Sequence, residues 1–428
     1  MKAVGLITEY NPFHNGHLYL IEEARRITGA DCVVVVMSGD FVQRGTPAVM
    51  DKYLRASAAL SCGADLVFEL PVCYATGSAE FFAEGAIRLL DSLGIVDCIC
   101  FGSECGDISI LSETASILIS EPTEYRQCLK EQLKCGSNFA KARAEAFRLT
   151  FPMYAKVLDT PNNILGIEYI KALQKIGSSI KPYTIRRKGH AYHDTECTHS
   201  FASASAVRRL MTGSMTDASL SLSDSEYSNP LKALELYVPQ SALNLYASGK
   251  NKVFPVTEDD FSAVLYYSLC NKSAGSALSD YFEVNTELDN RISKLLPGFR
   301  SFSHFAMLLK NKSCTYSRIC RGLLHILLDI KSSDLSEYCD NGWIFYNRLL
   351  GMRNSAKASE ALGLIAKLSS VPLLTTVKNT TVQDALSEDT AKRMLKTDIA
   401  ASDIYEHISS IKYAREPLPE ATRVFLKI

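Results

Sequence analysis

The sequence predicts an α/β fold, a Rossmann-like doubly wound parallel sheet followed by a mainly helical second half. Cys32 to Met37 is a continuous, valine-rich run, the pattern of a strand buried on both faces of a parallel sheet. Short apolar runs then alternate with helical periods as far as Phe101, which is the βαβα order of doubly wound folds. Beyond residue 230 helical periods dominate.

The individual elements follow from the spacing of apolar residues. Ala3 to Thr8 is a short apolar run that ends at a turn-rich segment, and Gly16 to Ile27 then carries apolar residues at helical spacing, which predicts strand, loop and helix. We expect the sheet to end near residue 210. The following elements are expected in order: Tyr53–Ser61 (helix), Leu66–Leu70 (strand), Ala79–Leu93 (helix), Val96–Phe101 (strand), Ser120–Leu149 (largely helical), Asn163–Lys175 (helix), Lys181–Arg187 (strand) and Ser203–Met211 (helix).

A domain boundary is expected at Thr212 to Pro230, which is rich in Ser, Asp and Asn and has little periodic hydrophobicity. We therefore predict a first domain at residues 1–212, a linker at 213–230 and a mainly helical domain at 231–428. The segments of the second half that carry the prediction are Phe261–Leu269, Glu287–Leu296, Phe302–Leu309, Tyr316–Ile330 and Ala356–Leu368 (helical) and Trp343–Leu350 (strand-like).

Composition narrows the class of protein. The formal net charge is -1, with 46 basic and 47 acidic residues, so no global field attracts nucleic acid or a membrane. Thirteen cysteines lie scattered without a CxxC pair, which fits reduced cytosolic thiols. The longest apolar runs are far shorter than the roughly 20 residues of a membrane span. A cytoplasmic protein without membrane contact is expected.

The most informative motif is His14-Asn15-Gly16-His17, between the first predicted strand and the first predicted helix. A glycine lets the backbone approach a phosphate, and the helix N-terminus offers unpaired N–H groups. The two imidazoles can donate to a triphosphate as charge builds on departing pyrophosphate. One alternative is a chance tetrapeptide in a turn; another, a zinc site, lacks a nearby third ligand.

Three segments together resemble a known family. They are Gly5 to His17 (GLITEYNPFHNGH), Met37 to Gly45 (MSGDFVQRG) and Asp51 to Arg55 (DKYLR). They are similar to the bacterial tRNA(Met) cytidine acetate ligase family of HxGH nucleotidyltransferases. The resemblance extends over nearly the whole chain. It implies ATP contacts at Ile7, Thr8, Glu9, Tyr10, Asn11, Pro12, Phe13, His14, Asn15, Gly16, His17 and Leu18.

The resemblance also implies a reaction. Free acetate would attack the α-phosphate of ATP to give acetyl-adenylate and pyrophosphate, and N4 of the wobble cytidine of elongator tRNA(Met) would then take the acetyl group. Mg²⁺ is expected with ATP because the triphosphate charge must be neutralised. No obligate protein partner is evident.

Further ATP contacts are expected at the carboxyl ends of strands. Gly102 follows the Val96–Phe101 strand, although a plain turn is the alternative. Asn162 resembles an ATP contact, while an asparagine cap on the helix that starts there is the alternative. Arg187 and Lys188, at the end of a predicted strand, are candidates for phosphate contacts, and solvated surface charge competes with this interpretation.

Phe201 to Arg208 is similar to the second nucleotidyltransferase signature. In that signature, the β- and γ-phosphates are contacted by hydroxyl groups at a helix start and by an arginine. Ser205 and Arg208 are therefore catalytic candidates beside His14 and His17, with an N-cap and a surface arginine as the alternative. Asp40 follows the valine-rich strand and is a further catalytic candidate that could orient the attacking group or the accepting amine. Its role stays open.

His190, His193, Cys197 and His199 are possible zinc ligands, but their spacing matches no standard site, so no metal site is expected. For RNA, residues 300 to 329 offer five cations against Asp329 alone. Some of these cations could be only the solvated side of a helix. The candidates for RNA contact are Lys310, Lys312, Tyr316, Arg318 and Arg321.

Two other functions remain open at this point. One is an adenylyltransferase that acts on a phosphorylated cofactor precursor, and such an enzyme rarely needs about 200 further helical residues. The other is a nucleotide-sensing RNA-binding protein without turnover, which the intact His14 and His17 argue against.

Overall fold

The computed structural model describes residues 1–136, 139–187, 201–213, 230–250, 252–273, 277–378 and 389–428. Its strands are β1 (Ala3–Thr8), β2 (Cys32–Ser38), β3 (Phe41–Val42), β4 (Thr46–Pro47), β5 (Leu66–Leu70), β6 (Val96–Ser103), β7 (Lys181–Arg186), β8 (Asn347–Met352), β9 (Leu373–Leu374) and β10 (Leu426–Lys427). Its helices are α1 (Asn15–Thr28), α2 (Lys52–Ser61), α3 (Val72–Ala75), α4 (Ala79–Ser92), α5 (Ile108–Ser120), α6 (Thr123–Lys134), α7 (Phe139–Thr150), α8 (Pro161–Ile176), α9 (Ala204–Thr212), α11 (Pro230–Leu234), α12 (Gln240–Gly249), α13 (Ser262–Ser273), α14 (Thr286–Leu295), α15 (Phe302–Leu309), α16 (Tyr316–Leu328), α17 (Ser332–Asp340), α18 (Ala356–Leu368) and α20 (Asp389–Lys412).

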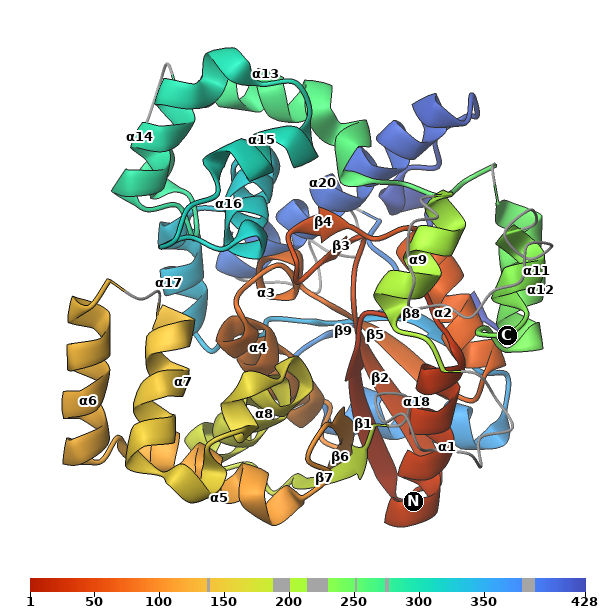
Figure 1. Cartoon of the computed structure of the whole chain (residues 1–428). Helices are drawn as coiled ribbons and strands as arrows, with labels where there is room; N and C mark the ends of the chain where they lie inside the picture. Colours follow the sequence, from red (N-terminus) through yellow and green to blue (C-terminus); the bar gives the residue numbers. More distant parts are fainter. Residues whose placement is uncertain (137–138, 188–200, 214–229, 251, 274–276, 379–388) are drawn as a thin grey trace.

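The centre of the molecule is a mostly parallel sheet with helices on both faces (Figure 1). Its strand order is β10-β8-β5-β2-β1-β6-β7, and β9 pairs with β8 at one side. The pairs from β5 through β7 are all parallel, whereas β8 runs antiparallel to β5. This is the doubly wound α/β fold that the sequence predicts.

The valine-rich strand β2 is buried along its whole length because helices cover both faces of the sheet. Val34 and Val36 contribute to a core that includes α4 and α8. Val33 and Val35 point to the other face and join a core that includes α1, α2, α9 and α12. Alternate side chains of this one strand therefore pack into two separate cores, as expected for a strand in the middle of an α/β sheet.

The sheet does not end near residue 210, and this prediction was wrong. Strands β8, β9 and β10 come from the second half of the chain. In the β5–β8 pair, Glu69 lies opposite Arg348, 279 positions away in the sequence. Local periodicity carries no signal for such a pairing. Residues 214–229 of the predicted linker lie outside the described residues.

Helix α20 is a second feature that periodicity does not reveal. It is the longest of the described helices, and much of its buried face is polar, including Asp398, Ser402 and Glu406. A helix that buries polar side chains shows no regular apolar stripe, so the usual signal is missing. The predicted helices of the second half are confirmed as α13 to α16 and α18. Of the described helices, none combines the length and apolar character needed to cross a membrane.

Candidate active site

The segment from Glu9 to His17, here called the ATP loop, lies where the strand order of the sheet reverses. Strand β1 pairs with β2 on one side and with β6 on the other, so the chain winds outward from β1 in both directions. In open α/β sheets, the carboxyl ends of strands at such a switch point form the ligand crevice. His14 to His17 follow β1, and Gly102 lies at the end of β6. The topology therefore brings the two predicted segments to one crevice.

His14 and His17 form the N-terminal cap of helix α1. His14 is the N-cap residue, and its Nδ1 accepts a hydrogen bond from the Gly16 backbone N–H at 3.1 Å. Nδ1 of His17 accepts from the His14 backbone N–H at 3.2 Å, which completes a capping box. The two rings stack with their centroids 3.8 Å apart. The helix start thus fixes the orientation of both imidazoles.

This arrangement determines the protonation of the two rings. Each Nδ1 accepts a hydrogen bond, so each neutral ring carries its proton on Nε2. Burial, assisted by the charges of Arg187 and Arg208, lowers the pKa of His14 to about 3. Burial and the neighbouring His14 also hold the pKa of His17 well below its ordinary value. Two neutral imidazoles therefore offer Nε2–H donors to a ligand.

Gly16 is required by the closeness of the His14 ring. A Cβ atom at this position would lie 2.9 Å from Cε1 and 3.1 Å from Nδ1 of His14. Any larger residue would displace the imidazole from its capping position. The glycine between the two histidines therefore makes room for the ring as well as for a phosphate.

Residues from the second half of the chain hold the ATP loop in place, and the sequence gives no local signal for them. The Asn15 backbone N–H donates to the Tyr237 carbonyl at 2.9 Å, and Asn15 Nδ2 donates to the Leu236 carbonyl at 3.0 Å. The Tyr246 hydroxyl donates to the Phe13 carbonyl at 3.2 Å. The backbone groups of the loop thus find partners in the segment that contains α11 and α12.

The remaining loop residues are mostly buried supports. Tyr10 has a positive φ of 46° and lies with its ring centroid 4.9 Å from those of both Phe13 and His17. Asn11 Oδ1 accepts from the Val49 backbone N–H at 2.9 Å, and the bond between Asn11 and Pro12 is cis. Burial is complete or nearly so for most of the predicted ATP contacts, and Ile7, Glu9, Gly16, His17 and Leu18 are half-buried.

A pocket opens beside the two histidines. Its lining includes the predicted residues Gly102 and Arg187, which come from the ends of β6 and β7. Gly16, a predicted ATP contact, also lines the pocket, and Phe201, Ala202 and Ser203 belong to the predicted motif Phe201 to Arg208. Three lining residues, Tyr19, Leu20 and Ile185, are not predicted as site residues from the sequence.

Arg187 is positioned by Asn162 and Glu104. Arg187 Nη1 donates to Asn162 Oδ1 at 3.2 Å, and Asn162 Nδ2 donates to Glu104 Oε1 at 2.6 Å. The Glu104 carboxylate also accepts the Asn163 backbone N–H at 2.9 Å. Although burial opposes ionisation, these hydrogen bonds keep the pKa of Glu104 below its ordinary value. Glu104, not an asparagine side chain, therefore caps helix α8, and the simple asparagine-cap interpretation is wrong.

Ser205 and Arg208 lie together against the ATP loop. Arg208 Nη1 donates to the Asn11 carbonyl at 2.6 Å, and Nη2 donates to Ser205 Oγ at 3.0 Å. Burial lowers the pKa of Arg208, while the negative charge of Glu9 opposes this shift. The cap of helix α9 is Ser203, whose hydroxyl accepts the Ala206 backbone N–H at 3.2 Å. Ser205 therefore does not cap helix α9, which was the alternative role that the sequence allowed.

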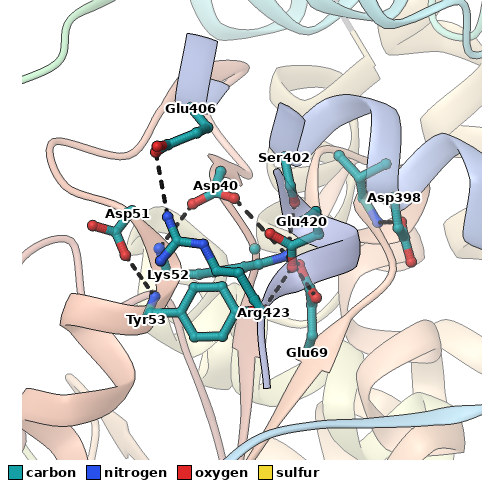
Figure 2. Close-up of polar contacts among 12 residues, drawn as sticks. Asp40, Asp51, Lys52, Tyr53, Glu69, Asp398, Ser402, Glu406, Glu420 and Arg423 are labelled. Atoms are coloured by element: carbon teal, nitrogen blue, oxygen red, sulfur yellow. Dashed lines mark hydrogen bonds and ion pairs between the residues drawn. The ribbon is translucent and has the colours of Figure 1, made fainter. Parts of the chain in front are cut away.

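Asp40 lies away from the pocket, in a buried cluster of charges (Figure 2). Its Oδ1 accepts the Lys52 backbone N–H at 2.8 Å, and its Oδ2 lies 4.0 Å from Lys52 Nζ. Burial raises the pKa of Asp40 to about 6, although the Lys52 charge opposes this. The structure therefore does not join Asp40 to the two histidines.

The cluster is centred on the fully buried ammonium of Lys52. Lys52 Nζ lies 2.7 Å from Glu69 Oε1, 2.9 Å from Glu420 Oε1 and 2.7 Å from Ser402 Oγ. Arg348 pairs with Glu69 at 3.0 Å and also with Glu420. Despite its burial, the two cations lower the pKa of Glu420 to about 2. Residues from both halves of the chain thus neutralise one another (Figure 2).

The predicted RNA contacts gather around α16. Lys310 and Lys312 are exposed, and Tyr316 and Arg318 are half-buried. Arg321 is different because it pairs with Glu283 at 2.7 Å and its side chain is only 14% exposed. Lys310 and Lys312 are therefore the most accessible of the five side chains, and Arg321 is held in an ion pair. Lys188 and the considered zinc ligands His190, His193, Cys197 and His199 lie outside the described residues.

Comparisons with known proteins agree with this geometry. The family model of the HIGH nucleotidyl transferases matches residues 1–418. The tRNA(Met) cytidine acetate ligase of Thermoanaerobacter sp. (strain X514) is 43% identical over 408 residues, 95% of each chain. The ligase of Acetivibrio thermocellus is 38% identical over 415 residues, 95% of this chain and 94% of the relative.

Solved structures cover the same length. Thermotoga maritima TmcAL bound with alpha-thio ATP matches with a TM-score of 0.84 at 31% identity, and the match covers 100% of both chains. The apo form matches with a TM-score of 0.87 over the same coverage. Taken with the paired histidines at the switch point, these matches show that the chain belongs to the tRNA(Met) cytidine acetate ligase family of HIGH nucleotidyl transferases.

Proposed function

We propose that this protein is an ATP-dependent tRNA(Met) cytidine acetate ligase. It activates acetate as acetyl-adenylate and transfers the acetyl group to N4 of the wobble cytidine of elongator tRNA(Met). The observation that carries the proposal is the pair of neutral, stacked imidazoles at the N-terminus of α1, with Arg187 and Arg208 beside them. These groups suit a triphosphate that must release pyrophosphate.

In the first step a carboxylate oxygen of acetate attacks the α-phosphorus. The bond from that phosphorus to the bridging oxygen breaks, and pyrophosphate leaves with its electron pair. Nε2–H of His14 and of His17 would stabilise the charge that develops on the phosphate oxygens. Arg187 and Arg208 would hold the β- and γ-phosphates, and Gly102 and Asn162 would line and support the nucleotide site.

In the second step the N4 amine attacks the acyl carbon, AMP leaves, and the amine gives up one proton. The helical half of the chain, residues 231–428, would bind the tRNA through Lys310, Lys312, Tyr316 and Arg318, with Arg321 held by Glu283. Asp40 is buried at the start of α2 and would support the strand ends rather than touch the reactants. A tRNA substrate places the reaction in the cytoplasm.

Mg²⁺ would enter with ATP. Among the described residues no three metal-ligating side chains gather, so phosphate oxygens and water would supply most of its ligands. This fits Mg²⁺, which keeps several waters and binds substrate phosphates rather than an all-protein cage. Its chemistry would be to neutralise the triphosphate charge.

The direct test is incubation of the purified protein with ATP, Mg²⁺, radiolabelled acetate and total bacterial tRNA, followed by nucleoside analysis. Label in N4-acetylcytidine is the expected outcome, and label with acetyl-CoA in place of ATP and acetate is not expected. A matched incubation with tRNA that lacks the elongator tRNA(Met) should stay unlabelled.

The same incubation separates the two other functions. An adenylyltransferase of cofactor precursors would release pyrophosphate only with a phosphorylated small molecule and would leave the tRNA unlabelled. A nucleotide-sensing RNA-binding protein would bind ATP and tRNA but release no pyrophosphate with any acceptor. Either result would overturn the ligase proposal.

A further inference from the structure

The turn at residues 43–45 lies between the ATP loop and the predicted RNA-binding helix. It joins the short strands β3 and β4, which follow the end of β2. On one side, the Gln43 backbone N–H donates to Glu9 Oε1 at 2.9 Å. On the other side, Gly45 has a φ of +78°, and a Cβ there would collide with the backbone of Cys320 and Arg321 in α16. The turn therefore contacts both sites.

Arg44 occupies the middle of this turn and is exposed. It forms no ion pair or hydrogen bond with another described residue. Its positive charge nevertheless acts on the Arg208 guanidinium and helps burial to lower the pKa of that group, although Glu9 and Glu258 act in the opposite direction. An exposed, unbonded guanidinium close to a second guanidinium favours an anionic ligand.

Glu258 provides an independent link between the two sites. Its charge raises the pKa of Tyr316 in addition to the larger effect of burial, and it also acts on Arg208. Glu258 therefore acts on both Arg208 and the first residue of α16. Helix α16 itself packs against β4, the strand that follows the Arg44 turn, so the turn and the predicted RNA contacts lie on adjoining parts of the molecule.

We propose that Arg44 binds a backbone phosphate of the tRNA anticodon loop next to the nucleotide that accepts the acetyl group. The loop would lie across the turn at residues 43–45, between Arg208 and α16. The inference rests on the proposed function and deepens it by naming where the acceptor enters.

The position of Arg44 favours an RNA phosphate over a phosphate of ATP. Arg44 does not line the pocket with His14, His17 and Arg187, and it does not bond to the ATP loop as Arg208 does through the Asn11 carbonyl. Its backbone neighbour Gly45 packs on α16, which carries the predicted RNA contacts. A guanidinium binds phosphate through paired N–H donors, so lysine at the same position would replace it only in part.

The experiment separates the two half-reactions in R44A and R44K. Adenylation is followed as acetate-dependent exchange of pyrophosphate into ATP without tRNA. Transfer is followed as the kcat and KM for tRNA(Met) acetylation, and tRNA affinity is measured by filter binding over a series of salt concentrations. The matched control is R26A, because Arg26 is an exposed arginine at the far end of α1, paired with Glu23.

In R44A we expect unchanged pyrophosphate exchange and a Kd for tRNA raised about 10-fold, with R44K between wild type and R44A. The slope of log affinity against log salt should fall by about 0.7, the value for one contact to a single-stranded phosphate. R26A should match wild type in all assays.

Two results would overturn the inference. Loss of pyrophosphate exchange in R44A would place Arg44 on ATP, and unchanged exchange with unchanged tRNA affinity would make it an ordinary surface cation. A wild-type protein that exchanges pyrophosphate but does not bind or acetylate tRNA would overturn the proposed function itself, whatever R44A does.

Discussion

The ATP pocket and the Lys52 cluster concentrate charge in different ways. In the cluster, Lys52 and Arg348 pair directly with the carboxylates of Glu69 and Glu420. At the ATP site, Arg187 in the pocket and Arg208 against the ATP loop bond to an amide oxygen, a backbone carbonyl and a hydroxyl, and among the described residues no carboxylate bonds to them.

This difference distinguishes charges that stabilise the fold from charges that are available to bind a ligand. A buried cation that already has its carboxylates can accept no further anion, and its loss leaves uncompensated charge. Cations held only by neutral oxygens keep their positive charge available for a ligand. Substitutions in the cluster should therefore change stability, and substitutions in the pocket should change the reaction.

The largest effect is expected for Lys52→Met. The change leaves Glu69 and Glu420 buried with one cation fewer, and breaking a buried pair in this way costs about 3–5 kcal/mol. Urea unfolding followed by circular dichroism should show the loss. In contrast, Lys357→Met removes an exposed partner of Asp31 and should leave the unfolding midpoint nearly unchanged. Equal midpoints for the two variants would refute the structural role of the cluster.

The next largest effect is expected for the double variant His14→Asn and His17→Gln. Asparagine is a favourable N-cap residue and glutamine can complete a capping box, so both changes keep the start of α1. Both replace a ring Nε2–H donor, whose position the imidazole fixes, with the NH2 group of a flexible amide. We expect a loss of about 100- to 1,000-fold in the rate of pyrophosphate exchange, with the unfolding midpoint close to wild type.

The single variants His14→Asn and His17→Gln show which imidazole contributes more to the rate of pyrophosphate exchange. If the double variant exchanged pyrophosphate at the wild-type rate, the pocket would not be the adenylation site. If it unfolded as readily as Lys52→Met, the distinction between the two regions would fail.

The smallest effect concerns pH. The pKa of His14 is about 3 in the folded protein, below its ordinary value of 6.5, and that of His17 is also lowered. Between these values the unfolded chain binds more protons, so stability is present above pH 6.5 and declines as pH falls. From pH 7 to 5.5 the wild type should lose about 2–3 kcal/mol more than the His14→Asn, His17→Gln variant. Parallel stability curves would contradict the lowered pKa values.

Local sequence predicts the first half of the fold well, for a physical reason. Strands such as β2 are buried on both faces, so their apolar runs are continuous and easy to recognise. Strand β8 was anticipated only as a strand-like piece at Trp343–Leu350, and its place beside β5 depends on a distant partner. Helix α20 was missed because its buried positions are polar.

The candidate site likewise contains residues that the sequence predicts and residues that it does not predict. The sequence locates His14, His17, Gly102 and Arg187 because each lies at or just after the carboxyl end of a predicted parallel strand, and the pocket contains all four. It cannot locate Glu104 as the support of Asn162, or Tyr246 as the partner of the Phe13 carbonyl, because these contacts join distant segments. It also cannot distinguish Asp40, a buried support, from a reactive carboxylate by position alone.

The contact that Glu420 makes with a distant part of the chain has a consequence for folding during synthesis on the ribosome. Tyr53 and Glu420 bond to each other across 367 positions of sequence. At about 5–20 residues per second, roughly 20–70 s separate their synthesis. Until Arg348, Ser402 and finally Glu420 are made, Lys52 lacks its full set of partners. A nascent chain of residues 1–212 therefore carries the complete ATP loop but not the partners that neutralise its buried lysine, so the nucleotide site should become fully ordered only after the last segment emerges.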